Sequence, residues 1–149
     1  MDTEATAQAQ GANTGPKVIR ATQFILEDET GKTRARLAVS KGGRPGLALF
    51  DETGKRRATL AVTEAGPGLA LFDENSKPRV MLTAAKAGPG LLLFDETGKL
   101  RAALVVRKDG PWLDLLDETG KSRAALSVGK EGPVLRLRDE TGMVIRSQP

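Results

Sequence analysis

The side chains that most often perform catalysis or bind metals are missing from this sequence. Its 149 residues include no cysteine, no histidine and no tyrosine. Thiol nucleophiles, Ser-His-Asp triads, haem ligation by histidine and zinc sites built from cysteine and histidine are therefore excluded. The phosphate loop Gly-x-x-x-x-Gly-Lys-Ser/Thr is also absent. Paired carboxylates remain as the main candidates for chemistry.

An Asp-Glu pair occurs six times, and two carboxylates can act as general acid and base or bind calcium. Adjacent side chains on a strand point to opposite faces, so Asp51 and Glu52 are poorly placed to act on one substrate. The spacing also lacks the alternating oxygen ligands of a calcium loop. We therefore expect no catalytic residue, no metal site and no cofactor, and we assign the pairs to turns.

The acidic pairs belong to a motif that repeats along the chain. Its first residues are spaced 23, 22, 22, 22 and 22 positions apart, and periods of roughly 20–50 residues mark repeat architectures. The six copies are Asp28-Glu29-Thr30-Gly31, Asp51-Glu52-Thr53-Gly54, Asp73-Glu74-Asn75-Ser76, Asp95-Glu96-Thr97-Gly98, Asp117-Glu118-Thr119-Gly120 and Asp139-Glu140-Thr141-Gly142. We expect a flexible tail (1–16) followed by a β-repeat array (17–149) with units at about 23–45, 46–67, 68–89, 90–111, 112–133 and 134–149.

Each unit reads as two short strands, because apolar residues alternate with period two on both sides of the motif. Asp and Gly suit the first turn, and Gly-Pro suits the second. Pairing Leu47 with Leu60 and Leu49 with Ala58 gathers the aliphatic residues on one face. A three-residue loop closed by a glycine bulge would instead divide them between the faces, so we favour the first register.

The fold class predicted from these units is all-β, with two possible architectures. In an antiparallel meander, about twelve strands each pair with the next strand in sequence. In a two-layer β-solenoid, each repeat is one coil and equivalent strands stack in parallel, about 4.8 Å apart. Parallel stacking would place aspartate on aspartate and arginine on arginine, so the meander is preferred.

A meander with one aliphatic face requires a partner, because that face must be buried against something. We predict homo-oligomerisation, as a trimeric β-prism, a sheet-on-sheet dimer or a filament. The residues assigned to this self-association face are Leu47, Leu49, Leu60, Val62, Leu69, Leu71, Leu82, Leu91, Leu93, Leu104 and Val106. On the other face we single out a contact stripe of Phe50, Phe72 and Phe94.

Charge does not concentrate on one segment, although the net charge is +4. Acidic and basic residues alternate at short range, so we expect no specific nucleic-acid partner. The recurrent arginines (Arg34, Arg57, Arg79, Arg101 and Arg123) are assigned to pairing with the turn aspartates, and Trp112 to packing at the start of a strand.

No apolar run approaches the ~20 residues of a membrane span. The N-terminus lacks a Sec signal, so we expect a cytoplasmic protein or part of a particle assembled without Sec export.

Two families of hairpin-repeat proteins share these features. The segment Leu49-Phe50-Asp51-Glu52-Thr53-Gly54-Lys55 resembles the YDxxGR core of bacterial YD repeats, although this chain lacks the tyrosine and closes its units with Gly-Pro. The meander with an aliphatic face is also similar to shaft segments of phage tail fibres, where trimerisation buries that face. Both resemblances cover residues 23–149 and imply an elongated repeat structure, and neither assigns a functional residue.

We therefore predict that the chain is a non-enzymatic structural protein, a self-assembling β-repeat rod or the subunit of a filament or fibre. The alternative from the same residues is a repeat binding module. It would present the recurrent arginines or the phenylalanine stripe to a polysaccharide or another anionic polymer.

Overall fold

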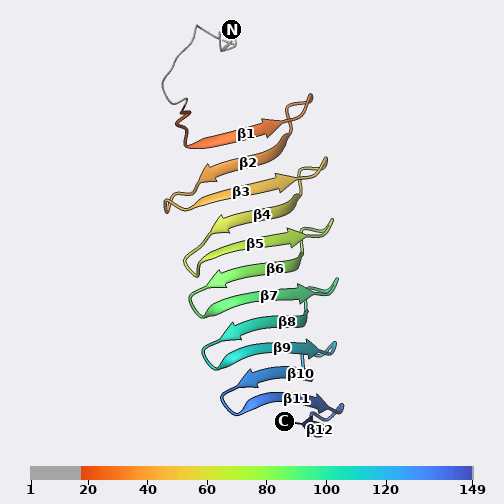
Figure 1. The fold of residues 1–149 in the computed structure, drawn as a ribbon. Helices are drawn as coiled ribbons and strands as arrows, with labels where there is room; N and C mark the ends of the chain where they lie inside the picture. The colour runs from red at the N-terminus through yellow and green to blue at the C-terminus, as the bar shows by residue number, and fades with distance from the viewer. Residues whose placement is uncertain (1–17, 149) are drawn as a thin grey trace, which may run out of the picture.

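The chain forms a single open antiparallel sheet in which the strands lie in sequence order (Figure 1). The computed structural model describes residues 18–148, so the predicted flexible tail (1–16) lies outside the described residues. The strands are β1 (Gln23–Glu27), β2 (Thr33–Val39), β3 (Pro45–Phe50), β4 (Arg56–Val62), β5 (Pro67–Phe72), β6 (Pro78–Ala85), β7 (Gly88–Phe94), β8 (Leu100–Arg107), β9 (Gly110–Leu116), β10 (Ser122–Gly129), β11 (Gly132–Arg138) and β12 (Val144–Gln148). The predicted meander is confirmed.

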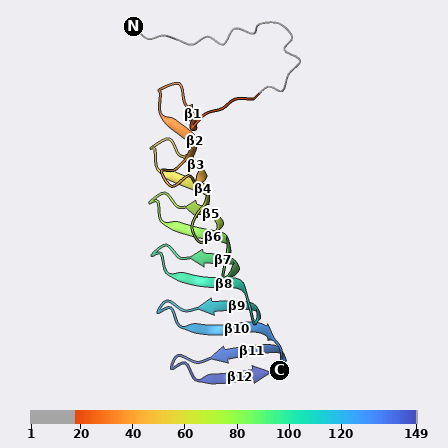
Figure 2. The same cartoon turned by 90° about the vertical axis from the view of Figure 1, so that its left-hand side faces the viewer.

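The sheet is shaped like a ladder, with β1 at one end and β12 at the other. The Asp-Glu turns follow one long edge in Figure 1, and the turns that carry most of the Gly-Pro pairs follow the other. Figure 2 shows the ladder from the side as one layer. Because every pairing is antiparallel and between sequence neighbours, the solenoid alternative, with parallel stacking, is wrong. At ~4.8 Å per strand, the ladder is roughly 55 Å long.

The hairpin turn combines the two registers that the sequence analysis treated as exclusive. The Asp51 amide donates to the Lys55 carbonyl (2.9 Å) and Gly54 has a φ of 82°, which are the features of a three-residue loop with a glycine bulge. The pairing then shifts by one residue, from Phe50 with Arg56 to Leu49 with Ala58. Our expectation that this loop would divide the aliphatic residues was wrong, because a second bulge at Arg57 restores their register.

One face of the sheet, which we call the aliphatic face, carries an unbroken row of leucines. Each pairs directly with the next across the strand boundary, both inside hairpins and between them. The leucine row consists of Leu37, Leu47, Leu60, Leu69, Leu82, Leu91, Leu104, Leu113, Leu126 and Leu135. A parallel row on the same face alternates leucine with alanine or valine, from Leu49 and Ala58 to Ala124 and Leu137.

The opposite face, which we call the groove face, has more varied side chains. Its central row runs Arg36, Ala48, Thr59, Ala70, Met81, Leu92, Ala103, Asp114, Ala125 and Arg136. Among the described residues, Ala125 is the only buried hydrophobic side chain. A single layer therefore leaves both faces without a hydrophobic core.

The third Asp-Glu turn has a serine where the other five have glycine. Ser76 adopts a φ of 61°, a conformation that L-residues rarely take and glycine takes freely. We expect Ser76→Gly to raise the free energy of unfolding by about 0.5–1 kcal/mol, since the relief of this strain exceeds the added chain entropy of the unfolded state. Thermal denaturation measures it, with Gly54→Ser as the reciprocal control that should lose stability. A lower melting temperature for Ser76→Gly would contradict this account.

Candidate functional site

The aliphatic face is the largest surface on which the sequence-predicted residues come together. All eleven residues assigned to self-association lie on it, because they occupy alternate positions in consecutively paired strands. Eight of these side chains are exposed, with Leu60 at 53% and Leu82 at 51%, whereas Leu47, Leu69 and Leu91 are half-buried. Three positions per strand over the ten strands of the leucine row make a strip of roughly 650 Å² in flat projection. The largest apolar patch on a typical monomer is about 300–600 Å².

Each Asp-Glu turn is held by the side chain of its aspartate. Asp51 Oδ1 accepts hydrogen bonds from the Thr53 amide (2.9 Å), the Thr53 hydroxyl (2.7 Å) and the Lys55 amide (3.0 Å). Four of the other five turns contain a threonine and make the same three bonds. In the remaining turn, Asn75 has no hydroxyl and donates only its main-chain amide to Asp73 Oδ1. The carboxylates are therefore engaged in turn structure.

The recurrent arginines point back to the aspartate of their own turn. The ion pairs are Arg34 with Asp28 (2.6 Å), Arg57 with Asp51 (3.8 Å), Arg79 with Asp73 (3.5 Å), Arg101 with Asp95 (3.7 Å) and Arg123 with Asp117. The predicted pairing with the turn aspartates is confirmed. These five guanidinium groups are consequently not a free ladder for an anionic polymer.

Neighbouring turns are joined by lysines along the same edge. Lys55 Nζ donates to the main-chain carbonyl of Glu74 (2.7 Å), and Lys77 Nζ donates to that of Glu96 (2.9 Å). Lys32 and Lys99 make the equivalent bonds, to Glu52 and Glu118. The edge of the ladder is thus tied from one repeat to the next by charge-assisted hydrogen bonds.

Hydrogen bonding lowers the pKa of all six turn aspartates. The Thr30 hydroxyl makes the largest contribution at Asp28 and lowers the pKa of that carboxyl to about 2. The threonine hydroxyl is also the main cause of the lowered pKa at Asp51, Asp95, Asp117 and Asp139, whereas at Asp73 the main cause is the Lys77 amide. These bonds stabilise the ionised form of each carboxylate.

The lowered pKa values predict acid sensitivity. Because the folded pKa lies below the ordinary value of 3.8, the unfolded chain binds more protons as the pH falls. The stabilisation is therefore present above about pH 4 and is lost as the pH falls toward about 2. Melting temperature measured against pH should show this decline. Thr97→Val should make it shallower, because it removes the main cause at Asp95, and a melting temperature that stays flat over this range would contradict the prediction.

The three phenylalanines of the predicted stripe lie on the groove face, but they belong to β3, β5 and β7 and so are not on adjacent strands. Phe50 is paired with Arg56, Phe72 with Pro78 and Phe94 with Leu100, so a residue of another strand separates each ring from the next. The Arg56 guanidinium lies over the Phe72 ring, 5.6 Å from its centre. The stripe is therefore a mixed row of rings and other side chains.

Sequence reasoning missed a group of arginines on the groove face. Arg107 and Arg136 both lie over the Trp112 ring, at 5.5 and 5.9 Å from its centre, beside a hollow of about 260 Å³. Arg36 and Arg56 border a larger hollow of about 630 Å³ between β2 and β4. These arginines do not recur at one position of the repeat, so the 22-residue period did not indicate that they lie together. Alternation along each strand could have placed them on one face.

Within residues 18–148, no group of three or more His, Cys, Asp or Glu side chains is arranged to hold a metal ion. The same part of the chain contains no helix with the length and apolar character needed to cross a membrane.

Comparison with known proteins adds no assignment to these surfaces. No protein-family model matches the sequence, and no curated protein matches it significantly.

Proposed function

We propose that this chain is a non-enzymatic structural protein whose copies associate through the aliphatic face to form a rod. The observation that carries the proposal is the leucine row, which crosses ten strands and has seven of its ten side chains exposed in a single copy. A face of this kind is stable in water only when another apolar surface covers it. Its flat area of roughly 650 Å² approaches the ~800 Å² that each partner contributes to a specific interface.

A second copy suits this face better than an unrelated partner does. The row repeats one residue type at one spacing, so an identical row can pack against it along its whole length. Symmetric oligomers use such self-complementary patches. Rotation about an axis along the ladder would bring two or three aliphatic faces together and leave the charged turns at the edges in solvent. A sheet-on-sheet dimer and a trimeric β-prism both meet this condition, and growth from the ends would give a filament.

The mass of the protein in solution tests the proposal. Light scattering coupled to size-exclusion chromatography should give a small whole multiple of 15.8 kDa, or a large polymer, across a wide range of concentrations. Electron microscopy should then show short rods or filaments. A folded monomer at high concentration would overturn the proposal.

A further inference from the structure

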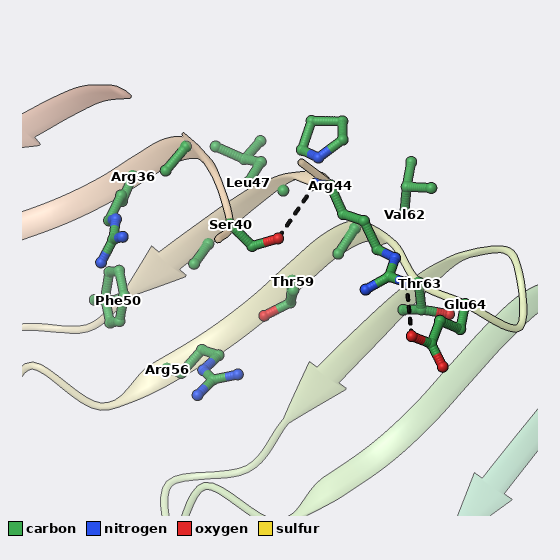
Figure 3. Close-up of a pocket in the computed structure, with 15 residues that line it drawn as sticks. Arg36, Ser40, Arg44, Leu47, Phe50, Arg56, Thr59, Val62, Thr63 and Glu64 are labelled. Carbon is green, nitrogen blue, oxygen red and sulfur yellow. Dashed lines mark hydrogen bonds and ion pairs between the residues drawn. The ribbon is translucent and has the colours of Figure 1, made fainter. Parts of the chain in front are cut away.

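The groove face holds a hollow whose lining is suited to an anion. It lies between β2 and β4, has a volume of about 630 Å³ and is open to solvent (Figure 3). Pockets of about 300–1,000 Å³ are typical of small-ligand sites. Arg36 and Arg56 border one end and Arg44 the other. We propose that this hollow binds an acidic sugar residue of an anionic polysaccharide.

Charge supports an anionic ligand. The lining contains three arginines and one carboxylate, Glu64, which is already paired with Arg44 at 2.7 Å. Among the ion pairs of residues 18–148, none involves Arg36 or Arg56. Two positive charges are thus uncompensated at one end of the hollow. A guanidinium group binds a carboxylate or sulfate through two parallel hydrogen bonds.

A polar group on the floor of the hollow also lacks a partner. Thr59 lies one strand beyond Ala48, which is itself paired with Arg36. The Thr59 hydroxyl oxygen is buried and forms no hydrogen bond, and in Figure 3 it is directed toward the end of the hollow where Arg36 and Arg56 lie. Buried hydroxyls are nearly always bonded, and this one could bond a ligand only after a neighbouring side chain moved to expose it.

The aromatic rings favour a sugar over a nucleotide. Single-stranded nucleic acids bind by stacking bases on open aromatic faces. Here the Arg56 guanidinium covers the Phe72 ring, and Figure 3 shows Arg36 directed toward Phe50. Phe50 is the one aromatic ring in the lining of the hollow, and a single ring cannot stack successive bases, whereas hydroxyl and guanidinium donors are present.

The shape of the groove face favours a polymer over a single residue. A second hollow of about 260 Å³ between β4 and β6 shares Thr59, Ala61 and Thr63 with the first. Its floor is made largely of small side chains, including Gly68 and Ala70. A chain anchored at the arginines can continue across these strands. Because this surface is opposite the aliphatic face, the inference does not depend on self-association.

Equilibrium binding of the full chain tests the proposal with four probes: polygalacturonate, dextran sulfate, neutral dextran and poly(U) RNA. We expect binding to polygalacturonate or dextran sulfate, the tighter of the two identifying the acidic group, and no binding to neutral dextran. Tighter binding to poly(U), or no binding to either anionic polysaccharide, would overturn the proposal.

Two variants with the same loss of charge distinguish a site from general attraction. Arg36→Gln/Arg56→Gln should weaken binding at least about tenfold, because each removes a charge-assisted contact. Lys86→Gln/Lys108→Gln, at exposed turns outside the hollow, should change it by less than about twofold. Equal losses in the two double variants would show that no built site exists.

Discussion

Leu82→Asp is expected to convert the assembled protein into monomers. In a single copy the Leu82 side chain is 51% exposed, so an aspartate there would remain hydrated and would cost the isolated sheet little. In an assembly built on the leucine row, the same carboxylate would be desolvated against leucines of a neighbouring copy. Burial of an unpaired charge costs several kcal/mol. The effect is repeated in every copy, so we expect the mass in solution to fall to 15.8 kDa. Because the uncovered sheet has no hydrophobic core of its own, the dissociated chain should also lose β-structure.

The matched control is Thr83→Asp, which introduces the same charge one residue further along β6. Thr83 lies on the groove face, opposite Gly68 and Gly90, so the assembly should keep its mass. Leu82→Gln provides a milder test of the same position if the aspartate variant does not fold. An unchanged oligomer for both Leu82 variants, with intact folding, would show that the aliphatic face is not the interface.

Gly110→Ala is expected to be strongly destabilising, as is Gly88→Ala at the equivalent turn one repeat earlier. Gly110 has a φ of 125°, and a Cβ at this position would collide with the main-chain carbonyl of Val128 on β10. An alanine therefore carries a backbone strain of about 1–3 kcal/mol. It also forces two strands apart, at a further cost of about 1–3 kcal/mol, the range found for overpacking. Chemical denaturation at a fixed protein concentration measures the sum.

Gly132 provides the control, because it separates backbone strain from the close approach. It occupies the equivalent turn one repeat later with a φ of 110°, and a Cβ there meets nothing within 4 Å. Gly132→Ala should therefore lose only the strain energy, about 1–3 kcal/mol. Equal losses at Gly110 and Gly132 would mean that contact with the Val128 carbonyl contributes nothing.

Local patterns in the sequence were enough to predict the strands and their pairing inside a hairpin. Leu47 lies opposite Leu60 and Leu49 opposite Ala58, as the alternation requires. The turn was only half predicted. The glycine bulge at Gly54 and the aliphatic register exclude each other in a simple hairpin, and the second bulge at Arg57 reconciles them. The residue types do not predict that bulge, because it depends on the pairing of both strands at once.

The same limit applies to the charged residues. The recurrent arginines could be assigned to the turn aspartates because both lie six residues apart in the same unit, as Arg101 and Asp95 do. The bond from Lys55 to the Glu74 carbonyl joins residues 19 positions apart in different units. Trp112 lies on β9, and the arginines around it come from the adjacent strand β8 and from β11, two strands away. Such contacts depend on how units stack.

By itself, the sequence determined the repeat, the all-β class, the two strands of each unit and the residues that share a face. These properties follow from interactions among residues less than one period apart, chiefly the alternation of side chains and the chemistry of the turns. Only the tertiary structure decided that hairpins continue into one open sheet, so that leucines from ten strands join in a single row. It also decided which of the other arginines border the hollow. The physical reason is that strand pairing between units is set by stacking in space, which no single unit encodes.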